Sequence, residues 1–114
     1  MEPKPITSHL VVLVNDRGQA HAVPGTLVVK EGEKIAFKSV GAGDVSLVFP
    51  RGILLAAPDD KEPVTEHRIT GDQTPEFTAC LKGVKPGIFT YAAYCRAVND
   101  VALGGSQPRI IIYR

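Results

Sequence analysis

Apolar and polar side chains alternate along much of this chain, a pattern typical of half-buried strands rather than helices. The alternation is longest from Ile88 to Cys95, where Phe89, Tyr91, Ala93 and Cys95 form one row. Successive side chains of a strand point to opposite faces of a sheet, and we expect this row to point inward. The same pattern predicts strands at Ser8–Val14, Gln19–Pro24 (bent), Thr26–Lys30, Lys34–Ser39, Val45–Phe49, Glu76–Leu81 and in the closing run from Arg109.

Short turns rich in Gly, Pro, Asn and Asp separate the predicted strands. Seven to eight short strands without a long helix predict an all-β fold, namely a Greek-key β-sandwich, in which Lys34–Ser39 is antiparallel to its neighbours. We expect a single domain over residues 1–114, with an irregular insert at about residues 50–74. Within the insert, weaker signals predict a short helix near Pro63–His67 and a short strand near His67–Thr70.

The two cysteines are expected to lie apart. In the predicted strand Glu76–Leu81, Cys80 is on the face opposite to Phe77, so we expect a partly exposed thiol. A hairpin centred on Lys85 would join this strand to the next one and keep Cys80 away from Cys95. That separation argues against a disulfide, which needs Cα atoms within roughly 7 Å of each other, unless the two strands lie in different sheets.

The closing strand is apolar on both faces, because Ile110 and Ile112 share one face while Ile111 and Tyr113 share the other. A strand of this kind is expected to be covered on both sides. The insert at about residues 50–74 is the favoured cover. The alternative is a partner chain, including a second copy of this one.

Charge and hydropathy exclude several classes of protein. The chain has 13 basic and 12 acidic residues and a formal net charge of +1, without the basic patch that nucleic-acid binding requires. No run approaches the roughly 20 apolar residues that span a bilayer, so we expect no membrane partner. The N-terminus lacks a charged leader with a long apolar run. We therefore expect a cytoplasmic protein, or a periplasmic or exported one if a signal peptide has been removed.

Catalytic motifs are missing from the sequence. The stretch GGSQP near the C-terminus lacks the spacing of a nucleophile elbow, and the GAG stretch at residues 41–43 lacks the third glycine of a dinucleotide site. No pair of carboxylates and no Cys–His couple is spaced for acid–base or nucleophilic chemistry. We therefore expect that the protein is not an enzyme.

Three segments, taken in order, resemble the cupredoxin family, which includes plastocyanin and azurin. They read GTLVVKEGEKIAFKS, DVSLVFP and EFTACLKGVKPGIFTYAAYC, and the resemblance extends roughly from Thr26 to Ile112. The tail from Gly104 to Ile112 also resembles bacterial cupredoxin-like proteins, many of which lack the copper ligands. The family binds type 1 copper through a His, a Cys, a second His and a weak axial Met. The resemblance implies a cupredoxin-like sandwich and makes copper the candidate cofactor.

Carried over residue by residue, the resemblance keeps one copper ligand, Cys95. It places the first His at Asp44 or Val45, the second His at Val98 and the axial Met at Leu103. Losing both imidazoles empties the first coordination shell, so the resemblance implies a domain without a type 1 copper site and without a cofactor. Cys95 is then either a small side chain of the core or a remaining metal ligand or redox thiol.

Other metal-binding side chains are scattered. His9, His21 and His67 lie in different segments without the close spacing of a zinc site. If the two N-terminal segments pair, His9 and His21 can approach and form a weak copper or zinc site; otherwise they are surface or edge histidines. An acidic cluster in the insert, interpreted as a solvated loop rather than a metal site, comprises Asp59, Asp60, Glu62 and Glu66.

Two hypotheses about function follow. The first is a non-enzymatic binding or interaction module without a copper site, whose partner is another protein or a second copy of the chain. The alternative is an atypical copper-binding or electron-transfer protein that combines Cys95 with His9, His21 or His67. The first hypothesis predicts no imidazole within bonding distance of Cys95, and the second predicts at least one.

Overall fold

The computed structural model describes residues 8–16, 19–57, 60–96, 100–101 and 108–114. This part of the chain contains twelve strands, β1 to β12, joined by turns and bends. Among these residues, no helix is long and apolar enough to cross a membrane. The all-β class predicted from the alternation is confirmed.

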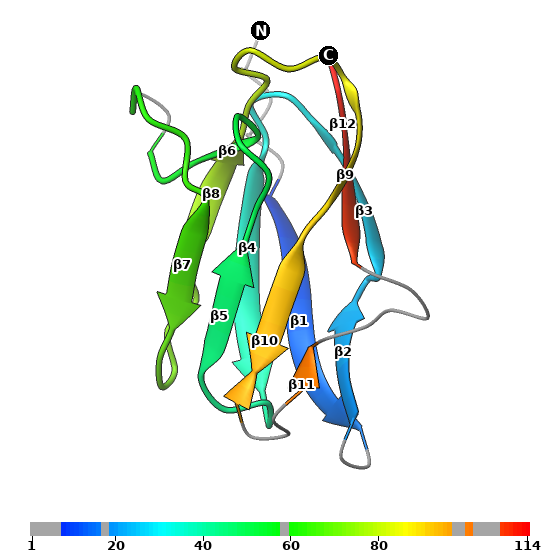
Figure 1. Ribbon diagram of the computed structural model, residues 1–114, viewed down its shortest axis with the longest axis vertical. Helices are drawn as coiled ribbons and strands as arrows, with labels where there is room; N and C mark the ends of the chain where they lie inside the picture. The colour runs from blue at the N-terminus through cyan, green and yellow to red at the C-terminus, as the bar shows by residue number, and fades with distance from the viewer. Residues whose placement is uncertain (1–7, 17–18, 58–59, 97–99, 102–107) are drawn as a thin grey trace, which may run out of the picture.

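The strands form three hydrogen-bonded sheets. The five-stranded sheet has the order β2 (Gln19–Val23), β1 (Ser8–Asp16), β4 (Lys34–Val40), β8 (Glu76–Ala79) and β6 (Leu54–Leu55). The four-stranded sheet has the order β11 (Asp100–Val101), β10 (Ala92–Cys95), β5 (Val45–Val48) and β7 (Glu66–Ile69). The three-stranded sheet has the order β3 (Thr26–Lys30), β12 (Arg109–Tyr113) and β9 (Gly87–Thr90). In Figure 1, β5 and β10 lie in front of β4 and β1.

The three-stranded and four-stranded sheets form one layer, because β9 and β10 are consecutive parts of one run separated by Tyr91 alone. At Tyr91 the run changes its partner from β12 to β5, and the Tyr91 N–H donates to the carbonyl of Pro108 at 3.0 Å. Tyr91, Ala93 and Cys95 are buried, which confirms the inward row. The single strand predicted from Ile88 to Cys95 is thus two strands in two sheets.

Strand direction differs in part from the prediction. β4 is antiparallel to β8, as expected for Lys34–Ser39, but it is parallel to β1. β3 and β12 are also parallel. Between β1 and β4 the chain passes through β3, which belongs to the other layer, and such a crossover returns a strand in the same direction.

Four aromatic side chains fill the centre between the layers. Phe37 of β4 lies with its ring centroid 5.5 Å from Phe49 and 5.8 Å from both Phe77 and Tyr91. Phe49 in turn lies 5.7 Å from Phe77 and 5.8 Å from Tyr91. Phe37 and Phe77 come from the five-stranded sheet, whereas Phe49 and Tyr91 come from the opposite layer. Tilted and edge-to-face contacts at these distances are the favourable geometries for aromatic rings.

The region at about residues 50–74 contributes a strand to each layer. β6 pairs with β8, and β7 pairs with β5 so that Val45 is opposite Ile69. The helix predicted near Pro63–His67 is wrong, because Glu66–Ile69 supplies the backbone hydrogen bonds for the open side of β5. The short strand predicted near His67–Thr70 is confirmed with a shift of one residue.

Cys80 is buried rather than partly exposed, with 6% of its surface accessible. Its N–H donates to the carbonyl of Ile53 at 2.8 Å, and its thiol donates to the carbonyl of Gly52 at 3.2 Å. The prediction was wrong because the segment beside β6 covers the outer face of the 76–81 run. The expected hairpin centred on Lys85 is also wrong, since β8 and β9 lie in different sheets.

The outer face of the closing strand β12 is less covered than the sequence predicts. Ile110 and Ile112 of β12 are buried, and Tyr113 on the other face is exposed. Beside it, Ile88 of β9 is 63% exposed. The two strands of the insert pair with β8 and β5, and the exposed Val28, Ile88 and Tyr113 show that the insert does not provide the cover that the sequence favoured for this face.

We predict that Gly52→Ala destabilises the fold more than Gly83→Ala. Both glycines have a positive φ, but a Cβ at Gly52 would lie 2.5 Å from the carbonyl oxygen of Lys82, whereas one at Gly83 meets nothing within 4 Å. Strain at positive φ costs about 1–2 kcal/mol in both variants, and the backbone clash adds about 1–3 kcal/mol at Gly52. Urea unfolding measures the difference. Equal destabilisation by the two substitutions would contradict the close approach of the 52 and 82 segments.

Candidate functional site

The corner that holds Cys95 is closed by an apolar neighbour. Cys95 ends β10 and pairs in register with Val45, the first residue of β5. Both side chains are 0% exposed and belong to the hydrophobic core. The Cys95 Sγ atom lies 3.9 Å from the carbonyl oxygen of Ala93, a distance at which a thiol makes at most a weak hydrogen bond.

The two positions at which the resemblance put the first histidine point in opposite directions. Val45 points inward at Cys95, and its isopropyl group has no lone pair to give a metal. Asp44 precedes it and carries its carboxylate on the outer side, where Oδ2 accepts from Nη2 of Arg68 at 3.2 Å. The side chains that the structure describes at this corner therefore do not fit a type 1 copper ion, which needs imidazole beside the thiolate. Val98 and Leu103 lie outside the described residues.

The histidines lie in separate environments. Nε2 of His9 is 3.1 Å from Oε1 of Glu33, and the His67 ring packs edge-on against Phe77 with centroids 5.3 Å apart. β1 and β2 do pair, as considered from the sequence, but their register puts His21 opposite Val14. Since Val14 is five residues from His9 along the strand, the two histidines are about 16 Å apart by strand geometry.

The acidic cluster of the insert supports a turn. Oδ2 of Asp60 accepts from the N–H of Ala57 at 3.1 Å, and the Asp60 N–H donates back to the Ala57 carbonyl at 3.0 Å. Glu62 and Glu66 are exposed, and Asp59 lies outside the described residues. Within the described part of the chain, no three His, Cys, Asp or Glu residues are grouped so that they could hold a metal ion.

A polar hollow of about 210 Å³ lies on the outer face of the four-stranded sheet, close to the Cys95 corner. Its lining comprises Asp44, Ser46, Arg68, Tyr94 and Arg96. Ser46 of β5 is directly opposite both Arg68 of β7 and Tyr94 of β10, so these three form a row across the sheet. Asp44 and Arg96 occupy the next outward positions, where the Arg96 N–H donates to the Asp44 carbonyl at 2.9 Å.

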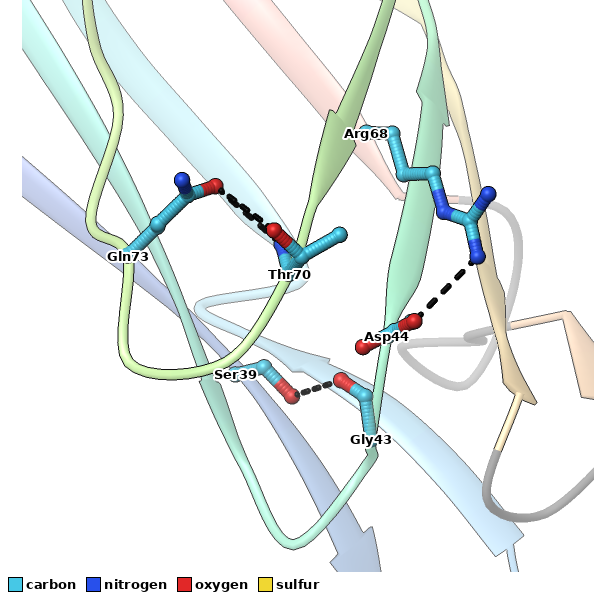
Figure 2. A network of polar contacts seen from close by, with 6 residues as sticks. All are labelled: Ser39, Gly43, Asp44, Arg68, Thr70 and Gln73. Atoms are coloured by element: carbon cyan, nitrogen blue, oxygen red, sulfur yellow. Dashed lines mark hydrogen bonds and ion pairs between the residues drawn. The ribbon is translucent and has the colours of Figure 1, made fainter.

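Two short turns hold the strand ends beside this hollow. Figure 2 shows the Arg68 side chain extending from β7 toward Asp44, with the two turns below it. The Ser39 hydroxyl donates to the Gly43 carbonyl at 2.8 Å, and the Thr70 N–H donates to Oε1 of Gln73 at 3.2 Å. The ends of β5 and β7 that carry Asp44 and Arg68 are therefore fixed by local hydrogen bonds.

Sequence reasoning did not identify this hollow. The five residues lie on or next to three strands, and more than twenty positions separate residue 46 from 68 and residue 68 from 94, so no local motif joins them. The one available signal was parity, because residues 44 and 46 share a face of β5, and residues 94 and 96 share the outward face of the β10 run. Parity alone could not show that β7 lies beside β5 and adds Arg68.

Comparison with known proteins identifies the fold. No known sequence family matches the chain, and no curated protein matches it in sequence. Among solved structures, it is similar to an oxidised plastocyanin from Dryopteris crassirhizoma, with 19% identity, a TM-score of 0.57 and coverage of 91% of this chain and 99% of the plastocyanin.

Two further solved structures are also similar to this chain. A purple cupredoxin from Nitrosopumilus maritimus matches with 8% identity and a TM-score of 0.55, covering 92% of this chain and 99% of the other. A pseudoazurin from Sinorhizobium matches with 17% identity and a TM-score of 0.54, covering 94% of this chain and 74% of the other. The chain therefore has a cupredoxin-like fold, as the sequence resemblance implied.

We predict that both thiols react slowly in the folded protein and rapidly in denaturant, because both are buried. Burial also raises the pKa of the Cys80 thiol above its ordinary value. A raised pKa in the folded state means that the associated stability is present below about pH 8.5, the unfolded value, and is lost as the pH rises toward the folded value.

The measurement is urea unfolding of the wild type and Cys80→Ala between pH 7 and 10. We expect the stability advantage of the wild type over Cys80→Ala to shrink above about pH 8.5. An advantage that grows with pH would show that Cys80 is held as a thiolate and would contradict its burial beside Gly52.

Proposed function

We propose that this cupredoxin-like domain is a non-enzymatic binding module that works without a type 1 copper centre. The observation that carries the proposal is the register pair of Cys95 and Val45, whose side chains are both fully buried in the core. Copper needs nitrogen ligands beside the thiolate, and a valine in that place packs against the cysteine instead. Cys95 then acts as a small core residue.

The chemistry of the buried groups supports a role other than catalysis. Cys80 and Cys95, the strongest nucleophiles by side-chain type, are both buried away from solutes. Burial raises the pKa of the Tyr91 hydroxyl, so its phenolate is even less accessible than that of an exposed tyrosine. A nucleophile needs access to substrate, which burial denies to both thiols, and a lowered pKa or a nearby base, whereas burial raises the pKa of Cys80 and Tyr91.

Exposed apolar side chains support a role in binding another protein. Ile111 of β12 pairs in register with Val28 on one side and Ile88 on the other, which gives a row across the outer face of the three-stranded sheet. Val28 and Ile88 are exposed, as is Tyr113 two residues farther along β12. Apolar side chains grouped on a sheet face mark a surface suited to a protein partner.

We predict that copper added to the reduced protein gives no intense visible absorption from a thiolate-to-copper transition. The physical reason is that Val45 occupies the space beside Cys95 and supplies no ligand. The titration is followed by absorption and by metal analysis after desalting, with Cys95→Ser as the matched control. An intense band in the wild type that is lost in Cys95→Ser would overturn the proposal and favour the copper-binding alternative.

A further inference from the structure

The outer face of β5, β7 and β10 carries a basic hollow whose charge is incompletely balanced. We propose that this hollow binds a single carboxylate group, presented by an Asp or Glu side chain of a partner protein. The inference rests on the proposed binding role and assigns it a site and a chemistry. The hollow has a volume of about 210 Å³ and is lined by Asp44, Ser46, Arg68, Tyr94 and Arg96.

Charge favours a singly charged anion. The hollow has two guanidinium groups, from Arg68 and Arg96, and one carboxylate, from Asp44, which leaves a local charge of +1 (two minus one). One incoming carboxylate neutralises this charge. A dianionic phosphate would leave a negative charge beside Asp44, where like charges repel. Carboxylate therefore fits the hollow better than phosphate.

The guanidinium of Arg96 supplies the main electrostatic attraction for the carboxylate ligand. Arg68 already has a counterion, since its Nη2 lies 3.2 Å from Oδ2 of Asp44. The Arg96 guanidinium makes no ion pair within the described part of the chain. A guanidinium presents a fork of N–H donors that matches the two oxygens of a carboxylate. The side chain of Ser46, on the same face, adds a hydroxyl group that can donate to it.

The surroundings favour a carboxylate carried by a protein over a free small acid. A second hollow of about 260 Å³ shares Ser46 and Arg68 with the first and is also lined by Val48, His67 and Glu66. The Glu66 carboxylate disfavours an anion there, so the acidic group of the ligand belongs in the first hollow. Val48 is 52% exposed and Tyr94 is 40% exposed, so apolar surface lies beside the basic groups. Tyr and Arg beside apolar surface are enriched where proteins bind each other. A peptide with an acidic residue between apolar ones can use both hollows.

The direct test is a titration of the full chain, followed by two-dimensional NMR at constant ionic strength so that general screening does not change. The probe is acetyl-Val-Glu-Val-amide, and its neutral control is acetyl-Val-Gln-Val-amide. We expect saturable shifts of the amide signals of Ser46, Tyr94 and Arg96 with the Glu peptide and little change with the Gln peptide. Equal shifts with both peptides would overturn the proposal.

Two further ligands test whether the hollow prefers carboxylate to phosphate and whether the carboxylate must be carried by a peptide. Acetate and inorganic phosphate are titrated under the same conditions. We expect acetate to bind the same residues more weakly than the Glu peptide does, and phosphate to bind more weakly than acetate. Acetate that binds as tightly as the peptide would overturn the assignment to a protein partner. Phosphate that binds more tightly than acetate would overturn the charge argument.

Three variants test whether the Glu peptide binds at this hollow. Arg96→Gln is expected to weaken binding of the Glu peptide by about tenfold or more, because it removes the guanidinium fork. Arg51→Gln, the same change at an exposed arginine elsewhere, should leave binding unchanged. Asp44→Asn should strengthen binding by about threefold or more, since it removes the competing charge and releases Arg68. Weaker binding by Asp44→Asn, or equal losses in Arg96→Gln and Arg51→Gln, would contradict the proposed site.

Failure of this inference is distinguishable from failure of the proposed function. A thiolate-to-copper band would refute the binding module without copper and would leave the carboxylate titrations as they are. Peptide titrations without saturable shifts, beside a silent copper titration, would refute the carboxylate site alone.

Discussion

The contact of Phe37 with three other rings holds the two layers of this domain together. Phe37 and Phe77 project from the five-stranded sheet, and Phe49 and Tyr91 meet them from the opposite layer at centroid distances of 5.5–5.8 Å. Each such pair contributes about 0.5–1.5 kcal/mol beyond the burial of its area. Because Tyr91 is also the residue at which β9 ends and β10 begins, the ring cluster fixes where the run passes from one sheet to the next.

The inward orientation of Tyr91 determines the face of the sheet to which each following side chain points. With Tyr91 inward, Ala93 and Cys95 are inward too, while Tyr94 and Arg96 face solvent. On β5 the same alternation puts Val45 against Cys95 and leaves Asp44 and Ser46 on the outer side. The ends of two adjacent strands thus form an apolar corner inside the sandwich and a basic hollow outside it.

Alternation made much of the fold predictable from sequence. It gave Thr26–Lys30 as observed, and it placed Phe37 and the 89–95 row on the correct faces, because a period of two is a local property. It failed at Cys80, because the cover of that residue comes from a segment nearly thirty positions away. The strand at Glu66–Ile69 was read partly as a helix for the same reason, since its partner β5 is distant in sequence.

The candidate sites, like the strands, could not be predicted where they depend on segments distant in the sequence. Through the cupredoxin resemblance, the sequence put the first ligand position at Asp44 or Val45, and the register shows that Val45 is the residue opposite Cys95. Sequence could not tell how far His21 lies from His9, because that depends on the register of β1 with β2. The hollow of Arg68, Tyr94 and Arg96 could not be predicted from parity alone, since it exists only when three strands are assembled in order.

The central claim is that the corner between β5 and β10 is a packed apolar core. The most direct measurement compares the free energies of unfolding of Val45→Ala and Val48→Ala, the same change three positions apart on one strand. Val45 is fully buried and Val48 faces solvent. The account predicts a loss of about 2 kcal/mol or more for Val45→Ala and less than about 0.5 kcal/mol for Val48→Ala. A Val45→Ala variant as stable as the wild type would show that the corner is loosely filled, and would contradict the account.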